Sequence, residues 1–233
     1  MILHDLCGAD PSHRFSPYCW RVRMALAHKG VPHEALPWRF TDKTAIIDAG
    51  TDKVPVLRHA GRTVSESWTI LAYLEDNWPG APTLFGGEGG RALARFVNTW
   101  SDAVVMPAVA RLVVSDIPAH LDPEDAAYFV RTREQRFGKP LTEVTANREH
   151  DVEAFRRDLH PLRMVLRERP WLSGPTAGAA DYIAFGPLQW ARCVSAFPLL
   201  TPDDPVHAWR GRLLNAFGGL ARDTPAQDHG QGR

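Results

Sequence analysis

The periodicity of apolar residues changes once along this 233-residue chain, and that change limits what the chain can fold into. Residues 1–77 alternate short apolar runs typical of strands with helical periods, whereas residues beyond 91 repeat with a helical period only. Prolines and glycines crowd the stretch from Pro79 to Gly90, a composition typical of a linker. We therefore expect a mixed α/β unit followed by an all-helical unit.

The first unit is predicted to follow the order β-α-β-α-β-β-α, which is the thioredoxin-like pattern. Its strands are expected at Ile2–Leu6, His33–Pro37, Val56–Arg58 and Thr63–Ser65, and its helices at Tyr18–Lys29, Thr41–Ala49 and Glu66–Asn77. The domain bounds that follow are 1–79 for the thioredoxin-like unit, 80–90 for the linker and 91–223 for the helical unit. Residues 224–233 lack an apolar pattern, so a frayed tail is predicted there.

The stretch Ser16-Pro17-Tyr18-Cys19 resembles the glutaredoxin active-site pattern C-P-Y-C with serine in place of the first cysteine. Pro17 suits the first turn of a helix, which places Ser16 at the helix N-terminus. Unpaired N–H groups and about half a positive charge at such a terminus stabilise a thiolate. A serine hydroxyl does not ionise unaided, but it can donate a hydrogen bond to sulfur. The prediction is a site that binds a small thiol and lowers its pKa; the alternative is that Ser16 only caps the helix.

Two further motifs allow a family to be named. Lys53-Val54-Pro55-Val56-Leu57 resembles a V-P-x-L signature, and Ser65-Glu66-Ser67-Trp68-Thr69-Ile70 resembles an E-S-x-A-I motif. Together with Ser16 they make the first third of the chain similar to the thioredoxin-like domain of the glutathione transferase superfamily, in its serine-type branch. The implied fold is this domain followed by an all-helical glutathione transferase C-terminal domain. Read without the family, Ser65 or Ser67 is an N-cap before an amphipathic helix.

The resemblance implies a glutathione site. Pro55 would be cis, with the backbone of Val54 pairing with the cysteinyl backbone of glutathione. Glu66 would pair with the γ-glutamyl ammonium, and Ser67 with its carboxylate. The remaining implied contacts are to the glycyl carboxylate, from Lys53 and Lys43, although both lysines are equally compatible with solvent-exposed positions.

The second unit carries a narrower resemblance. The segments Phe96-Val97-Asn98-Thr99-Trp100, Arg133-Glu134-Gln135-Arg136-Phe137-Gly138 and Asp181-Tyr182 are similar to those of bacterial β-aryl etherases, which cleave lignin-derived ethers with glutathione. The implied reaction is displacement of an aryloxide by glutathione thiolate. Candidates for the electrophile pocket are Trp100, Val104, Arg111 and Tyr182, with Arg111 also a candidate for stabilising the departing oxyanion. A tryptophan at helical spacing is alternatively a core residue.

Two other features of the second unit are local. The charged run from Arg131 to Arg136 is most simply the solvent-facing side of a helix that begins at Asp122-Pro123. Gly178 replaces the hydroxyl residue of the family's S/T-x-x-D capping box before Asp181, which predicts a cap weaker by about a few tenths of a kcal/mol. The family also implies a homodimer and a role in detoxification.

Composition excludes several other classes. Lys plus Arg and Asp plus Glu each number 27, so no charge surplus favours nucleic acid or an anionic membrane as a partner. Three cysteines, Cys7, Cys19 and Cys193, form no metal-ligand spacing and no even disulfide set, and no metal is assigned. The N-terminal sequence does not resemble a signal peptide, and no apolar run approaches the roughly 18 residues of a membrane-spanning helix. A reducing cytoplasm is the expected location.

Two functional alternatives stay open beside a glutathione transferase acting on a hydrophobic electrophile. A glutathione-dependent thiol oxidoreductase or lyase would need Cys7 or Cys19 to be exposed with a lowered pKa, because Ser16 cannot supply a thiolate. A non-catalytic protein that binds glutathione or another ligand is the second alternative, since thioredoxin-like folds also host functions without chemistry.

Overall fold

The structure, a computed structural model that describes residues 1–227, contains one four-stranded sheet with the strand order β2-β1-β3-β4. Its strands are β1 (Ile2–Leu6), β2 (Glu34–Trp38), β3 (Val56–His59) and β4 (Arg62–Ser65). Strand β1 runs parallel to β2 and antiparallel to β3, and β3 pairs antiparallel with β4. Leu3 and Leu57 lie opposite each other and are fully buried, as expected for the central strands of a covered sheet.

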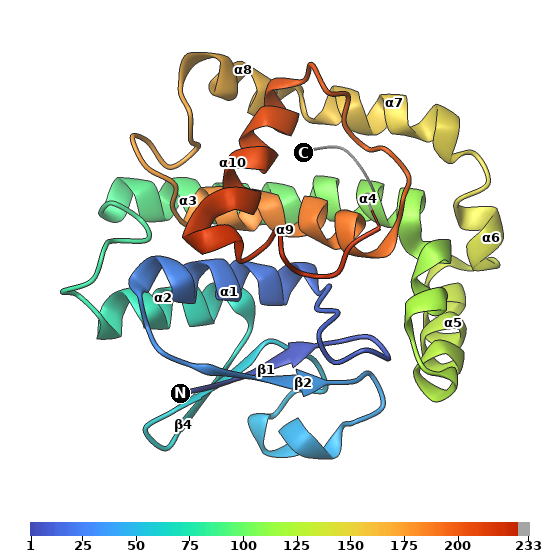
Figure 1. The fold of residues 1–233 in the computed structure, drawn as a ribbon, viewed down its shortest axis with the longest axis horizontal. Coiled ribbons are helices and arrows are strands. Elements are labelled where there is room, and N and C mark those ends of the chain that lie inside the picture. The colour runs from blue at the N-terminus through green and yellow to red at the C-terminus, as the bar shows by residue number, and fades with distance from the viewer. Residues whose placement is uncertain (228–233) are drawn as a thin grey trace.

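The first unit confirms the predicted thioredoxin-like order. It adds α1 (Pro17–Lys29), the short 3₁₀ helix η1 (Thr44–Ala49) and α2 (Ser67–Asn77) to the sheet. Helices α1 and α2 pack against each other and form a layer between the sheet and the helical unit (Figure 1). The observed bounds differ from the predicted ones by a few residues, the ordinary uncertainty at element ends.

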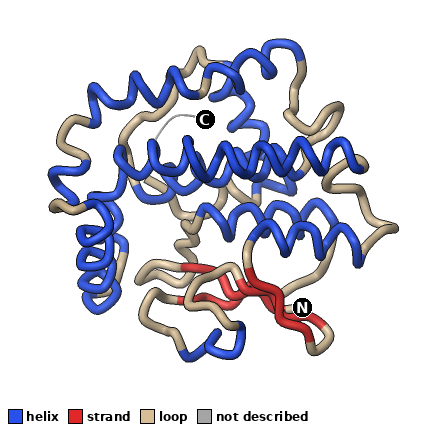
Figure 2. The backbone as a smooth tube through the Cα atoms, turned by 180° about the vertical axis from the view of Figure 1, so that it is seen from behind, coloured by secondary structure: helices blue, strands red, loops and turns tan. Residues whose placement is uncertain are grey.

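The described part of the second unit consists of helices joined by loops and contains no strand, as predicted (Figure 2). Its elements are α3 (Glu88–Trp100), the π-helical turn η2 (Ser101–Val105), α4 (Met106–Val113), the 3₁₀ segment η3 (Val114–His120), α5 (Pro123–Phe137), α6 (Leu141–Val144), α7 (Arg148–Asp158), α8 (His160–Glu168), α9 (Ala179–Val194) and α10 (Pro205–Gly219). Almost every residue of α9 is buried, because α1, α3 and α4 pack around it. Helix α9 is therefore the core of the helical unit.

The continuous helical stretch Glu88–His120 is long and apolar enough to cross a membrane by length and composition alone. In this fold it spans α3 to η3 and packs against α9 as part of the helical layer. The stretch also carries charged residues, among them Asp102, which forms an ion pair with Arg21 of α1. A third of its apolar window is buried by this packing.

The boundaries differ from the sequence-based expectation at two places. Helix α3 begins at Glu88, inside the stretch expected to be linker, because the chain turns at Gly87, whose φ of 106° suits only glycine, and then continues as helix. At the other end, Gln227 N donates to the carbonyl of Arg192 at 2.9 Å and Thr224 is buried. Residues 224–227 thus pack on the helical unit, and the rest of the predicted frayed tail lies outside the described residues.

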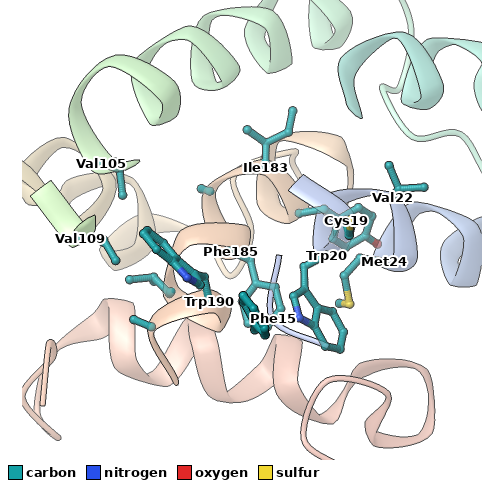
Figure 3. Close-up of a cluster of buried hydrophobic side chains, with 14 of the residues drawn as sticks. Phe15, Cys19, Trp20, Val22, Met24, Val105, Val109, Ile183, Phe185 and Trp190 are labelled. Atoms are coloured by element: carbon teal, nitrogen blue, oxygen red, sulfur yellow. The ribbon is translucent and has the colours of Figure 1, made fainter. Parts of the chain in front are cut away.

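The two units share one hydrophobic core. Figure 3 shows side chains of both units in a single cluster, with Phe15, Cys19, Trp20, Val22 and Met24 from the first unit and Val105, Val109, Ile183, Phe185 and Trp190 from the second. The closest backbone approach is at Gly186 of α9, where a Cβ atom would lie 2.4 Å from the carbonyl oxygen of Pro17. The absence of a side chain at Gly186 therefore lets the first turn of α1 sit directly on α9.

Gly178, the N-cap of α9, is required by packing. A Cβ there would lie 2.7 Å from the carbonyl oxygen of Leu84, which accepts a 2.8 Å hydrogen bond from Ala179 N. The cap itself is supplied by Asp181, whose buried carboxylate accepts from the backbone N–H of Gly178 at 3.1 Å. Gly178 itself provides no side-chain cap hydrogen bond, so the slightly weaker cap expected from the missing hydroxyl stays a prediction.

Candidate active site

A cavity of about 670 Å³ lies between the two units and is lined by residues of both. Its size is in the range of small-ligand sites. The first unit contributes the start of α1, the end of β1, the loop before β3 and the start of α2, while the second contributes η2, α4, η3, α5 and α9. Two helix N-termini, those of α1 and α2, thus meet at one cavity.

Ser16 is the N-cap of α1 and is 4% exposed. Its Oγ accepts a 3.2 Å hydrogen bond from the backbone N–H of Cys19, and its carbonyl accepts from Trp20 N at 3.0 Å. The predicted cap and the predicted cavity position are both present, so the two interpretations of Ser16 are compatible. Its hydroxyl also carries a proton that it can donate to a sulfur atom in the cavity.

The N-terminus of α2 is the second helix end at the cavity that can attract an anion. Glu66 is exposed, lines the cavity and has a φ of 69°, a backbone conformation that costs energy for a residue with a side chain. Ser67, the first residue of α2, is buried beside it. Strained backbone of this kind concentrates at ligand sites, and here it places a carboxylate next to unpaired N–H groups.

The other residues expected from the first unit also line the cavity. The Val54–Pro55 peptide bond is cis. The lysines differ in their surroundings. Lys43 donates to the carbonyl of Asp52 at 2.8 Å, and its ammonium lies 4.9 Å from the centre of the Trp38 ring. Lys53 is exposed, and its ammonium has no hydrogen-bond or ion-pair partner within residues 1–227. All seven residues predicted from the motifs of this unit therefore surround one space.

The cysteines do not meet the requirement for a thiol oxidoreductase. Cys7, Cys19 and Cys193 are buried, and none of them forms a disulfide within residues 1–227. Burial raises the pKa of the Cys7 thiol and raises that of Cys19 well above its usual value. A redox nucleophile needs an accessible thiol with a lowered pKa, so these thiols favour packing over reaction.

The pocket residues predicted from the second unit are placed differently. Arg111 on α4 lines the cavity, but Trp100, Val104 and Tyr182 are absent from the described lining. Tyr182 is fully buried on α9, and its hydroxyl lies 2.7 Å from His28 Nδ1 on the far end of α1. Burial raises the pKa of Tyr182, so its hydroxyl is neutral.

The π-helical turn η2 begins directly after Trp100 and contains Val104. An extra residue in η2 shifts the helix face, and the cavity is lined by Asp102, Met106, Pro107 and Ala110. Val104 belongs to an opposite stripe and is 36% exposed. The sequence showed an apolar stripe on this helix but not the π turn, so it gave no means of choosing the face.

Many cavity residues were not predicted as site residues, among them Tyr18, Asp102, Arg133 and Arg136. Tyr18 follows Pro17 in α1, and burial together with the charge of Asp102 raises the pKa of its phenol. Asp102 is held at 2.7 Å by Arg21, which is 1% exposed. The other two, Arg133 and Arg136, belong to the charged run expected to face solvent. Their spacing could have indicated a cavity position, because both lie near the aromatic residue Phe137 on the surface of the same helix.

Helix α5 is fixed against the first unit by its N-terminus. Asp122 caps the helix by accepting from Asp125 N at 3.0 Å, and the buried carboxylate of Asp125 accepts from the backbone N–H groups of Phe40 and Thr41 at 3.2 and 2.9 Å. These bonds hold the loop after β2 to α5. They therefore fix two cavity-lining segments, α5 and the loop with Phe40, to each other.

The fold and the cavity define a two-unit protein in which a thioredoxin-like unit and a helical unit share one site. Residues 15–77 match the family model for the glutathione S-transferase N-terminal domain, and residues 92–197 match that for the C-terminal domain. A probable glutathione S-transferase, GSTU6 of Oryza sativa subsp. japonica, is 38% identical over 231 residues, covering 89% of this chain and 85% of the rice protein. The chain therefore belongs to the glutathione S-transferase family.

Solved structures agree on the fold. The glutathione transferase GSTFuA3 of Phanerochaete chrysosporium superposes with a TM-score of 0.81 at 23% identity, covering 91% of this chain and 95% of that one. CsGST63524 of Ceriporiopsis subvermispora, determined in complex with glutathione, gives a TM-score of 0.79 at 23% identity, covering 96% and 98%. At this identity the likeness concerns architecture alone.

Proposed function

We propose that this protein binds glutathione in the cavity, stabilises its thiolate and directs it at a hydrophobic electrophile. The observation that carries the proposal is the placement of Ser16 at the N-terminus of α1 in the same cavity as Glu66 and Ser67 at the N-terminus of α2. One end suits a thiolate and the other suits an amino acid group. The glutathione-bound relative CsGST63524 supports the choice of thiol.

In this proposal each residue of the first unit has one task. Ser16 donates its hydroxyl proton in a hydrogen bond to the sulfur, and the start of α1 adds its positive end to lower the thiol pKa. Glu66 pairs with the γ-glutamyl ammonium, while Ser67 and the N–H groups of α2 bind the neighbouring carboxylate. The Val54 backbone aligns the cysteinyl part, and Lys53 with Lys43 attracts the glycyl carboxylate. No covalent intermediate with the protein is required.

The chemical step is a displacement at carbon. The sulfur forms a C–S bond, the bond to the leaving group breaks with both electrons going to that group, and the thiol proton is released to solvent. An aryl ether beside a ketone is one candidate electrophile, with an aryloxide as the leaving group. Arg111 is the residue proposed to stabilise that oxyanion, since it lines the apolar wall formed by Met106, Pro107 and Ala110.

Ultraviolet absorbance of bound glutathione thiolate, measured against pH, tests the proposal. We expect a bound-thiol pKa well below that of free glutathione, and a rise of that pKa in Ser16→Ala together with a fall in turnover of about 100-fold. Tyr18→Phe is the matched control, because it removes the neighbouring hydroxyl of the same cavity and should leave the thiol pKa unchanged. Binding without any pKa shift would instead favour a carrier, and an unshifted Ser16→Ala would transfer the role to backbone N–H groups.

A homodimer is the assembly that the family implies, and we include it in the proposal. Its support is an exposed apolar stripe along α3 and η2, with Leu93 43%, Phe96 70% and Val104 36% exposed and Trp100 packed half-buried between them. A second copy that presents the same stripe across a twofold axis would cover both. The lack of disulfides within residues 1–227 and the family's thiol chemistry support the reducing cytoplasm as its location and detoxification as its role.

Light scattering during size-exclusion chromatography measures the mass of the protein in solution and tests the proposed homodimer. Phe96→Asp should convert a dimer into a monomer, because it buries a charge at the centre of the proposed interface. Met164→Asp is the control, since Met164 is 44% exposed on α8, away from the stripe, and should leave the mass unchanged. A wild-type protein with the mass of one chain at micromolar concentration would contradict the homodimer.

A further inference from the structure

Three arginines line the helical side of the cavity, and none of them has a carboxylate partner within residues 1–227. Arg111 lies on α4, and Arg133 and Arg136 lie one turn apart on α5. By contrast, two other charged side chains of the lining are paired, Lys43 with Asp52 and Asp102 with Arg21. This wall of the cavity therefore carries uncompensated positive charge.

Arg133 is the most shielded of the three. Its guanidinium lies 4.7 Å from the ring centre of Phe129 and 5.4 Å from that of Phe40, and burial lowers its pKa. One nitrogen, Nη1, donates to Thr132 Oγ1 at 2.9 Å. A guanidinium has five N–H donors, and the structure of residues 1–227 gives Arg133 a hydrogen bond to Thr132 alone. Because Arg133 lines the cavity, its remaining donors are available to a ligand there.

This placement is costly unless something compensates for it. Removing a charge from water destabilises a protein when no partner replaces the lost solvation. The two aromatic rings compensate in part through cation–π attraction, but they do not use the donors. An anion that enters the cavity would use them, and a planar carboxylate matches the two-pronged geometry of a guanidinium.

Glutathione does not account for these arginines. In the proposed function its ammonium is matched by Glu66, one carboxylate by Ser67 at the start of α2, and the other by Lys53 with Lys43, all from the first unit. The arginines belong to the helical wall, together with Met106, Ala110 and Phe137, where the electrophile would lie. They remain available for a charge on the second substrate.

We propose that the electrophile carries a carboxylate next to an aromatic or otherwise apolar body, and that Arg133, assisted by Arg136, binds this carboxylate. The inference rests on the proposed function, because it names the substrate class of the same site. The arginines would set specificity in two ways. They attract the anionic substrate, and when a neutral analogue binds, their own charge loses water without gaining a partner, which weakens binding of that analogue.

The test compares chlorodinitrobenzoate, with its carboxylate para to the chloride, and the corresponding methyl ester. In both, the glutathione sulfur bonds to the ring carbon, chloride leaves with the bonding electrons, and the thiol proton goes to solvent. We expect the wild type to prefer the carboxylate by roughly ten-fold or more in kcat/KM after correction for the uncatalysed rates, and added salt to reduce the preference. Arg133→Met combined with Arg136→Gln should abolish it without changing the KM for glutathione.

Arg131→Gln is the matched control, because Arg131 lies on the same helix, lies over the Tyr128 ring and is absent from the cavity lining. It should keep the full preference. Arg136→Gln alone keeps the Phe129 stacking of Arg133 and should lose part of the preference, which provides a variant with little risk to folding. Equal losses for acid and ester, or a raised KM for glutathione in the arginine variants, would overturn the proposal.

Calorimetry with the two glutathione conjugates separates this inference from the proposed function, since it needs no turnover. Both conjugates share the tripeptide, so any difference in their affinity reports the carboxylate. A conjugate bearing the free acid that binds about ten-fold more tightly than its ester, with the difference lost in the arginine variants, supports the inference even if the protein fails to catalyse the reaction. Equal affinities would refute it even if the transferase activity is real.

Discussion

The two units that enclose the cavity differ in how their functional residues are specified. In the thioredoxin-like unit, every residue predicted from a short motif lines the cavity, from Ser16 at one helix N-terminus to Ser67 at the other. In the helical unit, only Arg111 of the four predicted residues does so. Backbone groups and helix ends line the first side of the cavity, whereas a helix face chosen by tertiary packing lines the second. Local motifs predict the former far better than the latter.

The largest effect should come from Asp181, which supports the helical unit. Its buried carboxylate accepts four hydrogen bonds, from the backbone N–H groups of Leu172, Ser173 and Gly178 and from Trp209 Nε1 at 2.9 Å. Asp181→Ala should lower the free energy of unfolding by about 3–5 kcal/mol, because four buried donors lose their acceptor. Urea denaturation followed by circular dichroism measures it. A loss below 1 kcal/mol would show that the helical wall does not depend on this cap.

A second prediction concerns the contact between the units. Gly186→Ala introduces a Cβ that would meet the Pro17 carbonyl, so α1 must move away from α9. We expect a loss of about 1–3 kcal/mol in the free energy of unfolding. Turnover should fall with it, because Ser16 is adjacent to the displaced residue.

Gly211 provides the opposite control. It lies in α10 with open space around the position of a Cβ, so Gly211→Ala should raise the free energy of unfolding by about 0.5–1 kcal/mol. The two variants make the same chemical change. Equal effects on stability would show that the close approach at Gly186 is unimportant.

Glu66→Gln and Arg111→Gln test whether each wall of the cavity serves a different substrate. In the proposed function the variant loses the ion pair with the glutathione ammonium but keeps the shape of the side chain, so the KM for glutathione should rise about ten-fold. Arg111→Gln should leave that KM unchanged and alter the KM for the electrophile. Steady-state kinetics with each substrate varied in turn gives both values. If the two variants affected the same KM, the assignment of one wall to each substrate would be wrong.

A further small effect is a pH dependence at Glu75, where α1, α2 and the linker meet. Burial alone would raise the pKa of Glu75, but hydrogen bonds from Leu84 N, Lys29 and Thr83 outweigh it and lower the pKa below its usual value of 4.5. A carboxyl with a lowered folded-state pKa contributes stability above the unfolded-state pKa and loses it as the pH falls through the folded-state pKa.

The stability difference between wild type and Glu75→Gln should therefore be constant at neutral pH, on the order of 1 kcal/mol, and shrink below about pH 4.5. Asp76→Asn is the control, since Asp76 follows it on α2 in an exposed pair with Arg91 and should show almost no difference at any of these pH values. Thermal melts across the pH range measure both. A difference for Glu75→Gln that grows on acidification would have the wrong sign.

Much of the first unit follows from sequence alone. Alternating apolar residues and short turns predicted its strands and helices to within a few residues, because these signals act between near neighbours in the chain. Pro17 and Ser16 together specify the start of α1, and the motif around Glu66 marks the start of α2. Helix ends with unpaired N–H groups are local features, so the residues at them could be assigned before any contact between distant segments was known.

Tertiary structure alone decided the second wall and the fit between the units. The need for Gly178 came from the approach of Leu84, which is distant in sequence, and the need for Gly186 came from Pro17. The π turn η2 selected which face of the long helix meets the cavity. Arg133 became a cavity residue because Asp125 fixes α5 to the loop after β2. Helical periodicity predicts that a helix has an apolar face. Which part of the molecule this face meets depends on packing between residues far apart in the chain.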